Sequence, residues 1–339
     1  MPQRPGIVGP VTPRQRTIAI VAAVSVAAAG VTVGVTLAQS DRAKTAIAGA
    51  PVVGKPLDGA PPLVLELGVR DDAEARGLRT ASGLLAAGKR VEAARRFSLY
   101  HSVAAQVAQI VAQWSPDAGL RGLQALALEH PDSGLVQLHL GLGLVWVGRL
   151  VEAEKAWRLA VEKDPDTGYA VRAGDLLHPD LPRGLPVFIP SFPDPSGLNG
   201  LAPAAQLALL RRRAEQGGVH DRITYGVALQ RLELRVSAER QFALAAAAAP
   251  DDPEALAAAA FARFDKQRPE RAFSQLGPLA KRFPHSATIR YHLGVLLLWL
   301  GQIDQARKEL RLAVGDGRTG EAVVDAARVL LTELAKLKK

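Results

Sequence analysis

A repeat with a period of 34 residues constrains this chain more than any other feature of its sequence. Small residues, alanines and prolines each recur at that spacing in the C-terminal half, and an isolated upstream unit has the same internal spacing. The recurring positions are Gly226, Ala260 and Gly294, then Ala238, Ala272 and Ala306, then Pro250 and Pro284, and upstream Gly141, Ala153 and Pro165. A repeat of this length is one supersecondary unit that buries its apolar face by stacking on its neighbours. The sequence therefore predicts an array of stacked units.

Composition and residue positions both favour α-helices within each unit. The chain is 48% hydrophobic but only 5% aromatic, and its abundant Ala and Leu are strong helix formers, whereas strands favour β-branched and aromatic residues. Small residues such as Gly141 and Ala153 let two helices approach closely. A large residue such as Trp157 or Phe242 is expected to fill the gap against the next unit. A proline then ends the second helix, because it lacks an N–H and clashes with the preceding turn.

Taken together, these positions resemble the tetratricopeptide repeat family, which has the same period. The family pattern Leu-Gly-x₂-Tyr…Ala-x₃-Phe…Pro has four counterparts: Leu140-Gly141-x₂-Leu144…Ala153-x₃-Trp157…Pro165, Tyr225-Gly226-x₂-Leu229…Ala238-x₃-Phe242…Pro250, Ala259-Ala260-x₂-Arg263…Ala272-x₃-Leu276…Pro284, and Leu293-Gly294-x₂-Leu297…Ala306-x₃-Leu310. The resemblance implies an all-α, right-handed superhelical solenoid of helix pairs. It also implies a concave groove that binds a protein or peptide.

The phasing divides residues 71–339 into units. They are expected at about 74–99, 100–133, 134–167, 219–252, 253–286 and 287–320, followed by a capping helix at 321–336. The stretch 168–218 is longer than one repeat and holds six prolines from Pro179 to Pro195. Because prolines interrupt helices, it is interpreted as a split unit, with helices at 169–177 and 202–216 around a Pro-rich insertion at 179–201.

Residues 17–38 form an uncharged apolar segment of 22 residues. At about 1.5 Å per residue, such a helix crosses the roughly 30 Å hydrocarbon core of a membrane. It is longer than the ~7–15-residue hydrophobic region of a signal peptide, although small residues at 36–38 leave cleavage open.

We expect a single-pass protein of the cell membrane, with a short basic segment at 1–16, a transmembrane helix at 17–38 and a flexible Pro/Gly linker at 39–70. Arg14 and Arg16 directly precede the apolar segment. They favour a cytoplasmic N-terminus and an extracytoplasmic solenoid.

By the resemblance, the first helix of each unit lines the protein-binding groove. The expected lining residues are Leu138, Leu142, Trp146, Ile223, Arg231, Phe261, Phe264, Tyr291, Val295 and Trp299. Contiguous exposed apolar surface usually marks a partner site. Three interpretations stay open: the groove binds a partner, it contacts another copy of the chain, or the insertion fills it with Val187, Phe188, Ile189 and Phe192.

Neither catalysis nor a cofactor is indicated. The chain has no cysteine, which removes disulfides and Cys-ligated metal sites. Its seven histidines form no HExxH motif or closely spaced pair, and no Gly-x₄-Gly-Lys phosphate loop occurs. We expect no enzyme, no cofactor and no metal site.

The charge distribution argues against nucleic acid as a partner. Of the net charge of +9, residues 1–55 carry +5 and the last four residues carry +3. A nucleic-acid binder concentrates basic residues on a folded face. The sequence thus favours a membrane-anchored protein-binding scaffold or assembly factor. The alternative is a self-assembling structural membrane protein that oligomerises through its membrane helix and its apolar groove.

Overall fold

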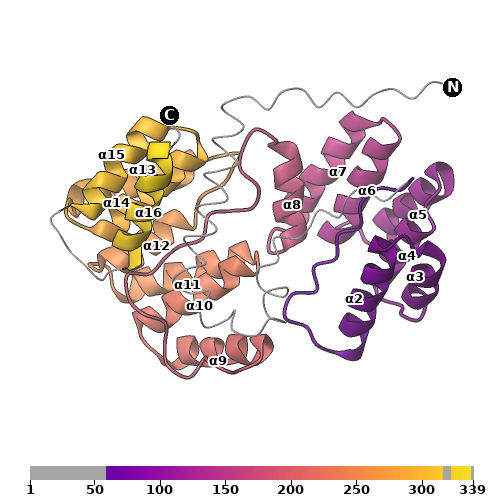
Figure 1. Ribbon diagram of the computed structural model, residues 1–339, viewed down its shortest axis with the longest axis horizontal. Coiled ribbons are helices and arrows are strands. Elements are labelled where there is room, and N and C mark those ends of the chain that lie inside the picture. The colour runs from indigo at the N-terminus through magenta and orange to yellow at the C-terminus, as the bar shows by residue number, and fades with distance from the viewer. Residues whose placement is uncertain (1–58, 316–321, 337–339) are drawn as a thin grey trace. The chain divides into compact units, whose positions relative to one another are not determined.

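The computed structural model describes residues 59–315 and 322–336, and these residues form α-helices and no β-sheet (Figure 1). The helices are α2 (Ala73–Ala86), α3 (Arg90–Phe97), α4 (Val103–Ala112), α5 (Pro116–Glu129), α6 (Gly134–Trp146), α7 (Leu150–Lys163), α8 (Gly168–Leu177), α9 (Pro203–Gln216), α10 (Val219–Arg231), α11 (Arg235–Ala248), α12 (Pro253–Phe261), α13 (Glu270–Arg282), α14 (Ala287–Trp299), α15 (Ile303–Val314) and α16 (Ala322–Lys336). The predicted all-α fold is confirmed for the described residues.

The described residues divide into two structural units. The N-terminal unit contains residues 59–178 and 195–248, and the C-terminal unit contains residues 179–194 and 249–336, except for the gap at 316–321. The Pro-rich insertion is therefore divided between them. Residues 179–194, called the central segment below, pack in the C-terminal unit, although the helices on either side of it in sequence, α8 and α9, belong to the N-terminal unit.

In the N-terminal unit, helices stack as hairpins. Helix α2 packs on α3, α4 on α5 and α6 on α7, and the first helices α2, α4, α6 and α8 contact one another in that order. A further hairpin joins α10 to α11, and α9 packs on α10. One buried core, around Leu123, Leu138 and Trp157, lies among helices α4 to α8.

The C-terminal unit repeats the arrangement with fewer helices. Helix α12 packs on α13 and α14 packs on α15, while α14 contacts both α12 and α16. Helix α16 occupies the position predicted for the capping helix and buries Val323, Ala327 and Leu330. Each repeat thus covers the apolar face of its neighbour, as a solenoid requires.

Short sequence motifs set the helix boundaries. The second helices α7, α11 and α13 end two residues before Pro165, Pro250 and Pro284, as the helix-breaking property of proline predicts. The next first helix then begins at a capping side chain: Ser133 accepts a hydrogen bond from the N–H of Val136, and Asp252 and Ser286 act in the same way for α12 and α14. Such caps contribute about 1 kcal/mol each.

At each of two repeated glycine positions, a large side chain from the second helix of the same hairpin packs over the glycine. A Cβ on Gly141 would lie 2.1 Å from Nε1 of Trp157, and one on Gly226 would lie 2.6 Å from the ring of Phe242. Trp157 also donates a hydrogen bond from Nε1 to the carbonyl of Leu138. The expectation that Trp157 and Phe242 fill the gap to the next unit is therefore incomplete: the glycine leaves a hollow within their own hairpin, and the large ring occupies it.

Tight turns between paired helices require one residue in the left-handed backbone conformation, with a positive φ angle. Gly88, Gly148 and Gly301 supply it with φ angles of +79°, +82° and +71°. In the α10–α11 turn this place is taken by Glu233, whose φ is 60°. A non-glycine residue there costs roughly 1 kcal/mol or more, so the Glu233 side chain is expected to compensate through its own contacts.

The predicted split unit at 168–218 is not a helix pair. Helix α8 packs on α7 and α6, and α9 packs on α10. The Pro-rich insertion separates the two helices, and each joins the hairpin nearest to it in sequence.

The predicted flexible linker 39–70 is corrected at its C-terminal end. Ala60, Val64 and Leu67 are at most 9% exposed, and this stretch packs against the core of the N-terminal unit. The apolar residues of Leu63-Val64-Leu65 and Leu67 supply the buried surface, which a count of prolines and glycines overlooks. Residues 39–58 lie outside the described part of the chain.

The predicted transmembrane helix 17–38 and the basic segment 1–16 also lie outside the described residues. Among the helices that are described, none is both long and apolar enough to span a membrane.

Candidate segment-binding sites

Most of the predicted groove residues are buried. Exposed fractions are at most 4% for Leu138, Ile223, Phe261, Phe264, Tyr291, Val295 and Trp299. Leu142 and Arg231 are partly buried, and Trp146 is 39% exposed. Of the ten side chains, only Trp146 is exposed in the structure.

The C-terminal unit brings several of these residues together. The rings of Phe264 and Trp299 lie with their centroids 6.0 Å apart. Phe261 and Tyr291 both meet the ring of His292 edge-on, at centroid distances of 4.7 and 4.9 Å. In the N-terminal unit, by contrast, Leu138 and Leu142 lie on α6, and Ile223 and Arg231 lie on α10, which is not packed on α6.

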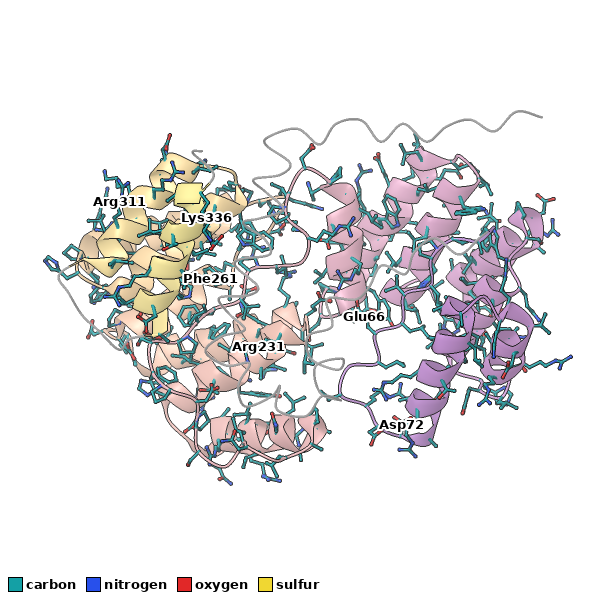
Figure 2. All side chains as sticks on the ribbon, in the orientation of Figure 1. Glu66, Asp72, Arg231, Phe261, Arg311 and Lys336 are labelled. Atoms are coloured by element: carbon teal, nitrogen blue, oxygen red, sulfur yellow. The ribbon has the colours of Figure 1, made fainter. Side chains whose placement is uncertain are left out.

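The central segment covers this aromatic cluster. Phe188 is 0% exposed, and its ring stacks on His292 with a centroid distance of 4.0 Å and an interplanar angle of 11°. The same ring meets Phe261 edge-on at 5.9 Å (Figure 2 labels Phe261). Of the three interpretations of the groove, the structure therefore shows the insertion filling it in the C-terminal unit.

The backbone of the central segment is bound by two side chains. The N–H of Ile189 donates to Nε2 of His292 at 3.0 Å. Two residues further on, the N–H and hydroxyl of Ser191 donate to the carboxylate of Glu254 at 2.7 and 2.8 Å. Thr288 Oγ1 also donates to Glu254, at 2.8 Å.

His292 is held in one neutral form. Its Nδ1 donates to the carbonyl oxygen of Thr288 at 2.7 Å, because a carbonyl can only accept. Nε2 is then left as an acceptor for the amide of Ile189. Burial lowers the pKa of His292 to about 3, which keeps the ring uncharged. Burial also raises the pKa of Glu254, against the opposing effect of its hydrogen bonds.

Nearer the N-terminal end of the central segment, Lys266 makes a third polar contact with it. Its Nζ donates to the carbonyl of Pro182 at 2.6 Å and lies 5.6 Å from the ring centroid of Trp299. We call the site formed by Glu254, Lys266 and His292 the C-terminal docking site. It holds the central segment by main-chain contacts at three points.

A second extended segment is bound in the N-terminal unit. The N–H of Val64 donates to Nε2 of His139 at 3.0 Å, and the N–H of Glu66 donates to the hydroxyl of Tyr169 at 3.0 Å. Nδ1 of His139 pairs with the carbonyl of Leu135 at 2.8 Å. Burial lowers the pKa of His139 to about 4. We call His139, Tyr169 and Arg172 the N-terminal docking site.

Arg172 anchors this site among three acidic side chains. Its guanidinium lies 3.7 Å from Glu66, 3.6 Å from Asp175 and 3.2 Å from Glu233. Arg172 is only 6% exposed. Burial, followed by the negative charge of Glu233, raises the pKa of Glu66 to about 8 despite the opposing charge of Arg172 (Figure 2 labels Glu66). The contact with Arg172 accounts for a glutamate at the strained turn position 233.

The two histidines occupy equivalent places in their repeats. Both belong to a His-Leu-Gly tripeptide, at 139–141 and 292–294, directly before the packing glycine. The two docked segments differ in sequence, Leu63-Val64-Leu65-Glu66 against Phe188-Ile189-Pro190-Ser191. The histidines have no metal-ligand spacing, and the repeated His-Leu-Gly tripeptide was the sequence signal that could have predicted both sites.

Exposed apolar residues gather at the turn between α6 and α7. Trp146, Leu150 and Val151 are 39%, 55% and 71% exposed. Val145 adds a further exposed side chain at the end of α6. This patch includes the one predicted groove residue that is open to solvent.

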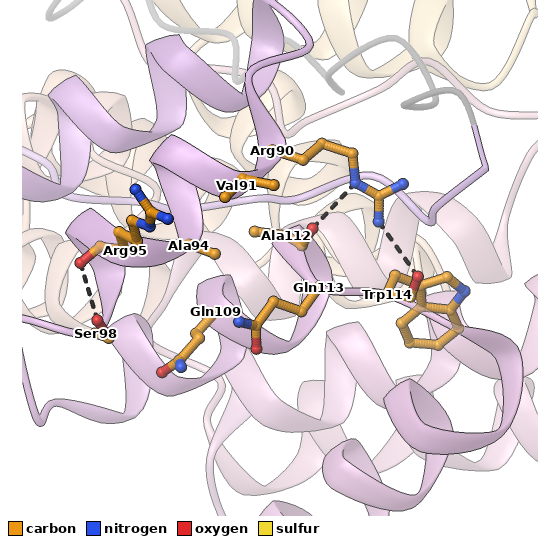
Figure 3. A pocket seen from close by; sticks show the side chains of 9 residues that line it. All are labelled: Arg90, Val91, Ala94, Arg95, Ser98, Gln109, Ala112, Gln113 and Trp114. Atoms are coloured by element: carbon orange, nitrogen blue, oxygen red, sulfur yellow. Dashed lines mark hydrogen bonds between the residues drawn. The ribbon is translucent and has the colours of Figure 1, made fainter.

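A pocket of about 450 Å³ lies between α3 and α4 (Figure 3). Arg90, on its wall, donates to the carbonyls of Ala112 and Trp114 at 3.0 and 3.3 Å. Its other polar lining comes from Arg95, Ser98, Gln109 and Gln113. No carboxylate or histidine lines it, so it offers no acid–base pair. Within the described residues, no group of three or more His, Asp or Glu side chains is placed to hold a metal ion.

Comparison with known proteins finds a family similarity in part of the chain. A tetratricopeptide repeat family model matches residues 263–331, which belong to the C-terminal unit. No curated protein matches the sequence.

Solved structures of similar proteins include a tetratricopeptide repeat protein from Parabacteroides merdae, with 12% identity, a TM-score of 0.31, and coverage of 76% of this chain and 98% of that one. Another is the C-terminal part of a repeat-containing protein from Cytophaga hutchinsonii, with 13% identity, a TM-score of 0.26, and coverage of 74% and 98%.

Proposed function

We propose that this protein is a non-catalytic scaffold or assembly factor that binds another protein and is anchored in the cell membrane. The observation that carries the proposal is the double use of the repeats as holders of extended polypeptide: residues 60–67 and 187–191 are both bound through main-chain amides. Stacked helical repeats commonly present extended binding surfaces.

The anchoring part of the proposal rests on residues 17–38. Their uncharged, apolar sequence has the length of a membrane-spanning helix. The arginines at 14 and 16 favour a cytoplasmic N-terminus, so that the repeats face away from the cytoplasm. In this arrangement the partner is a protein of the extracytoplasmic space or of the membrane surface.

Photo-crosslinking of the full chain in its native membrane tests the binding function. A crosslinkable residue replaces Trp146, which is exposed beside Leu150 and Val151. A matched control replaces Leu128, which is 85% exposed on α5. The proposal predicts one saturable heterologous adduct from position 146. Adducts with only a second copy of the chain favour the self-assembling alternative, and no specific adduct from several exposed positions contradicts the scaffold function.

A further inference from the structure

Within the C-terminal unit, the central segment is held by non-covalent contacts, as a bound peptide would be. Its ends continue into α8 and α9 of the N-terminal unit. Within the C-terminal unit, therefore, no direct chain connection joins residues 179–194 to residues 249–336. Packing and hydrogen bonds alone hold the segment on α12 and α14.

These contacts recognise an extended backbone. The amides of Ile189 and Ser191 are bound by His292 and Glu254, while Pro190 between them has no N–H to satisfy. Alternate residues of an extended chain point to the same side, which is why a first-helix histidine and a neighbouring side chain can bind residues i and i+2.

The same spacing in the N-terminal unit is an independent instance of the device. His139 and Tyr169 bind the amides of Val64 and Glu66, again residues i and i+2. The sequences of the two docked segments share no side chain at these positions. The repeated features are thus the histidine and the i, i+2 spacing of the bound amides, while the second side chain comes from the following first helix, α8, in one unit and from the preceding one, α12, in the other.

Side chains of the central segment add selectivity to backbone recognition. Phe188, directly before the amide bound by His292, is buried against His292 and Phe261. Two residues after that amide, the hydroxyl of Ser191 donates to Glu254. An occupant therefore needs a large aromatic residue, then the bound amide, then a hydroxyl residue two positions later.

We propose that the C-terminal docking site is the receptor for the partner, an inference that rests on the proposed function. The central segment is then a resident occupant, which a segment of the partner replaces. The partner presents an extended stretch with the pattern aromatic–apolar–x–Ser/Thr. Glu254 and His292 bind its alternate amides in place of those of Ser191 and Ile189.

The test is competition by a fluorescent peptide of residues 185–194, measured by anisotropy on the full chain in detergent. The chain variant Phe188→Ala weakens the resident segment. The peptide is expected to bind this variant at least about tenfold more tightly than the wild-type chain, since loss of a buried aromatic ring shifts the competition strongly. N-methylation of the peptide at Ile189 is expected to weaken binding about fivefold, because it removes one hydrogen bond.

Matched controls separate recognition from misfolding. N-methylation at Val187, for whose N–H the described residues provide no acceptor, is expected to leave the affinity unchanged. Adding His292→Phe to the Phe188→Ala chain is expected to weaken peptide binding at least fivefold, whereas adding His285→Phe, at an exposed histidine outside both docking sites, leaves it unchanged. If circular dichroism shows that Phe188→Ala loses helix, Ser191→Ala serves as the weakened resident.

Absence of peptide binding to a folded Phe188→Ala or Ser191→Ala chain overturns the proposal. So does equal binding of the two N-methylated peptides. Exchange of the central segment between two copies, seen as a concentration-dependent dimer of the wild-type chain that Phe188→Ala abolishes, overturns it in favour of self-assembly. If a partner crosslinks at position 146 and the crosslink persists in the His292→Phe chain, the scaffold function is supported and only the assignment of the C-terminal docking site as the receptor is wrong.

Discussion

His139 and His292 act in this fold as acceptors for main-chain amides. A histidine can do so only when one ring nitrogen is unprotonated, and burial secures that state by lowering the pKa values of the two rings to about 4 and about 3. Each ring is oriented by a carbonyl four residues earlier on its own helix. The helix thus fixes the tautomer as well as the position of the acceptor.

Glu66 gives the N-terminal docking site a pH dependence of opposite sign to that of His139. Burial raises the pKa of Glu66 to about 8 in the folded chain, from an ordinary value of 4.5. The folded chain therefore holds this proton more tightly, and unfolding releases it, so the free energy of unfolding falls as pH rises from 4.5 to about 8. For His139, with a lowered pKa, stability is lost as pH falls from about 6.5 to about 4.

Between pH 7 and 8, above the range in which His139 and His292 mainly titrate, Glu66 is expected to lower the free energy of unfolding by about 1 kcal/mol. Chemical denaturation at several pH values measures it. The variant Glu66→Gln is expected to flatten the profile in that window. An unchanged slope in the variant would show that another group is responsible.

Gly141→Ala tests the packing of the repeated glycine. The new Cβ would lie 2.1 Å from Trp157 Nε1, so the ring must move, and the chain is expected to lose about 1–3 kcal/mol of stability. Gly83→Ala is the control, because it lies within α2 with no atom within 4 Å of the added Cβ, and the greater helix propensity of Ala predicts a gain of about 0.5–1 kcal/mol. Thermal denaturation separates the two; equal effects would contradict the packing argument.

At the scale of elements, the helices could be predicted from local sequence patterns, whereas the extended segments could not. Repeated glycines and prolines located the helix pairs, because close packing and helix termination each demand a particular residue type. The docked segment 60–67 was missed, since its pairing partners lie 75 and 103 residues away. Local patterns carry no information about such partners, although the repeated His-Leu-Gly tripeptide marked where one partner would be.

Helix α11 begins at a contact that joins it to the α7–α8 connection. The carboxylate of Asp166 accepts hydrogen bonds from the N–H and hydroxyl of Ser237 at 2.9 and 2.6 Å. Asp166→Ala is expected to cost about 1–3 kcal/mol of stability, because it leaves two part-buried donors unpaired. Urea denaturation measures the loss. Asp132→Ala, at an exposed turn position, is the control, and an equal loss there would contradict this assignment.

At the scale of the whole molecule, the proposed anchor determines where the repeats meet their partner. Deletion of residues 2–38 is expected to move the chain from the membrane fraction to the soluble fraction after alkaline extraction, because the 22 apolar residues are removed. Protease added to intact cells is expected to cleave the full-length chain outside the membrane. Retention of the deleted chain in membranes, or protection of the full chain from protease, would contradict the proposed anchor or its orientation.

The sequence predicted which helices carry the groove residues better than it predicted whether their side chains are exposed. Phe261, Tyr291 and Trp299 were placed on first helices from repeat phase alone, and they lie there. What covers them depends on the path of residues 179–194, which leave the N-terminal unit after α8 and return to it before α9. Proline content predicted that this stretch is not helical, but no local rule predicts the surface on which a long insertion settles.

Amide hydrogen exchange, resolved by NMR for individual residues of the full chain, tests most directly whether the repeats bind extended segments through alternate amides. The amides of Val64, Glu66, Ile189 and Ser191 are expected to exchange at least about tenfold more slowly than those of Leu65 and Val187, because only the first four donate to buried or partly buried side chains. Equally rapid exchange at all six would show that neither segment is held, and would contradict the account.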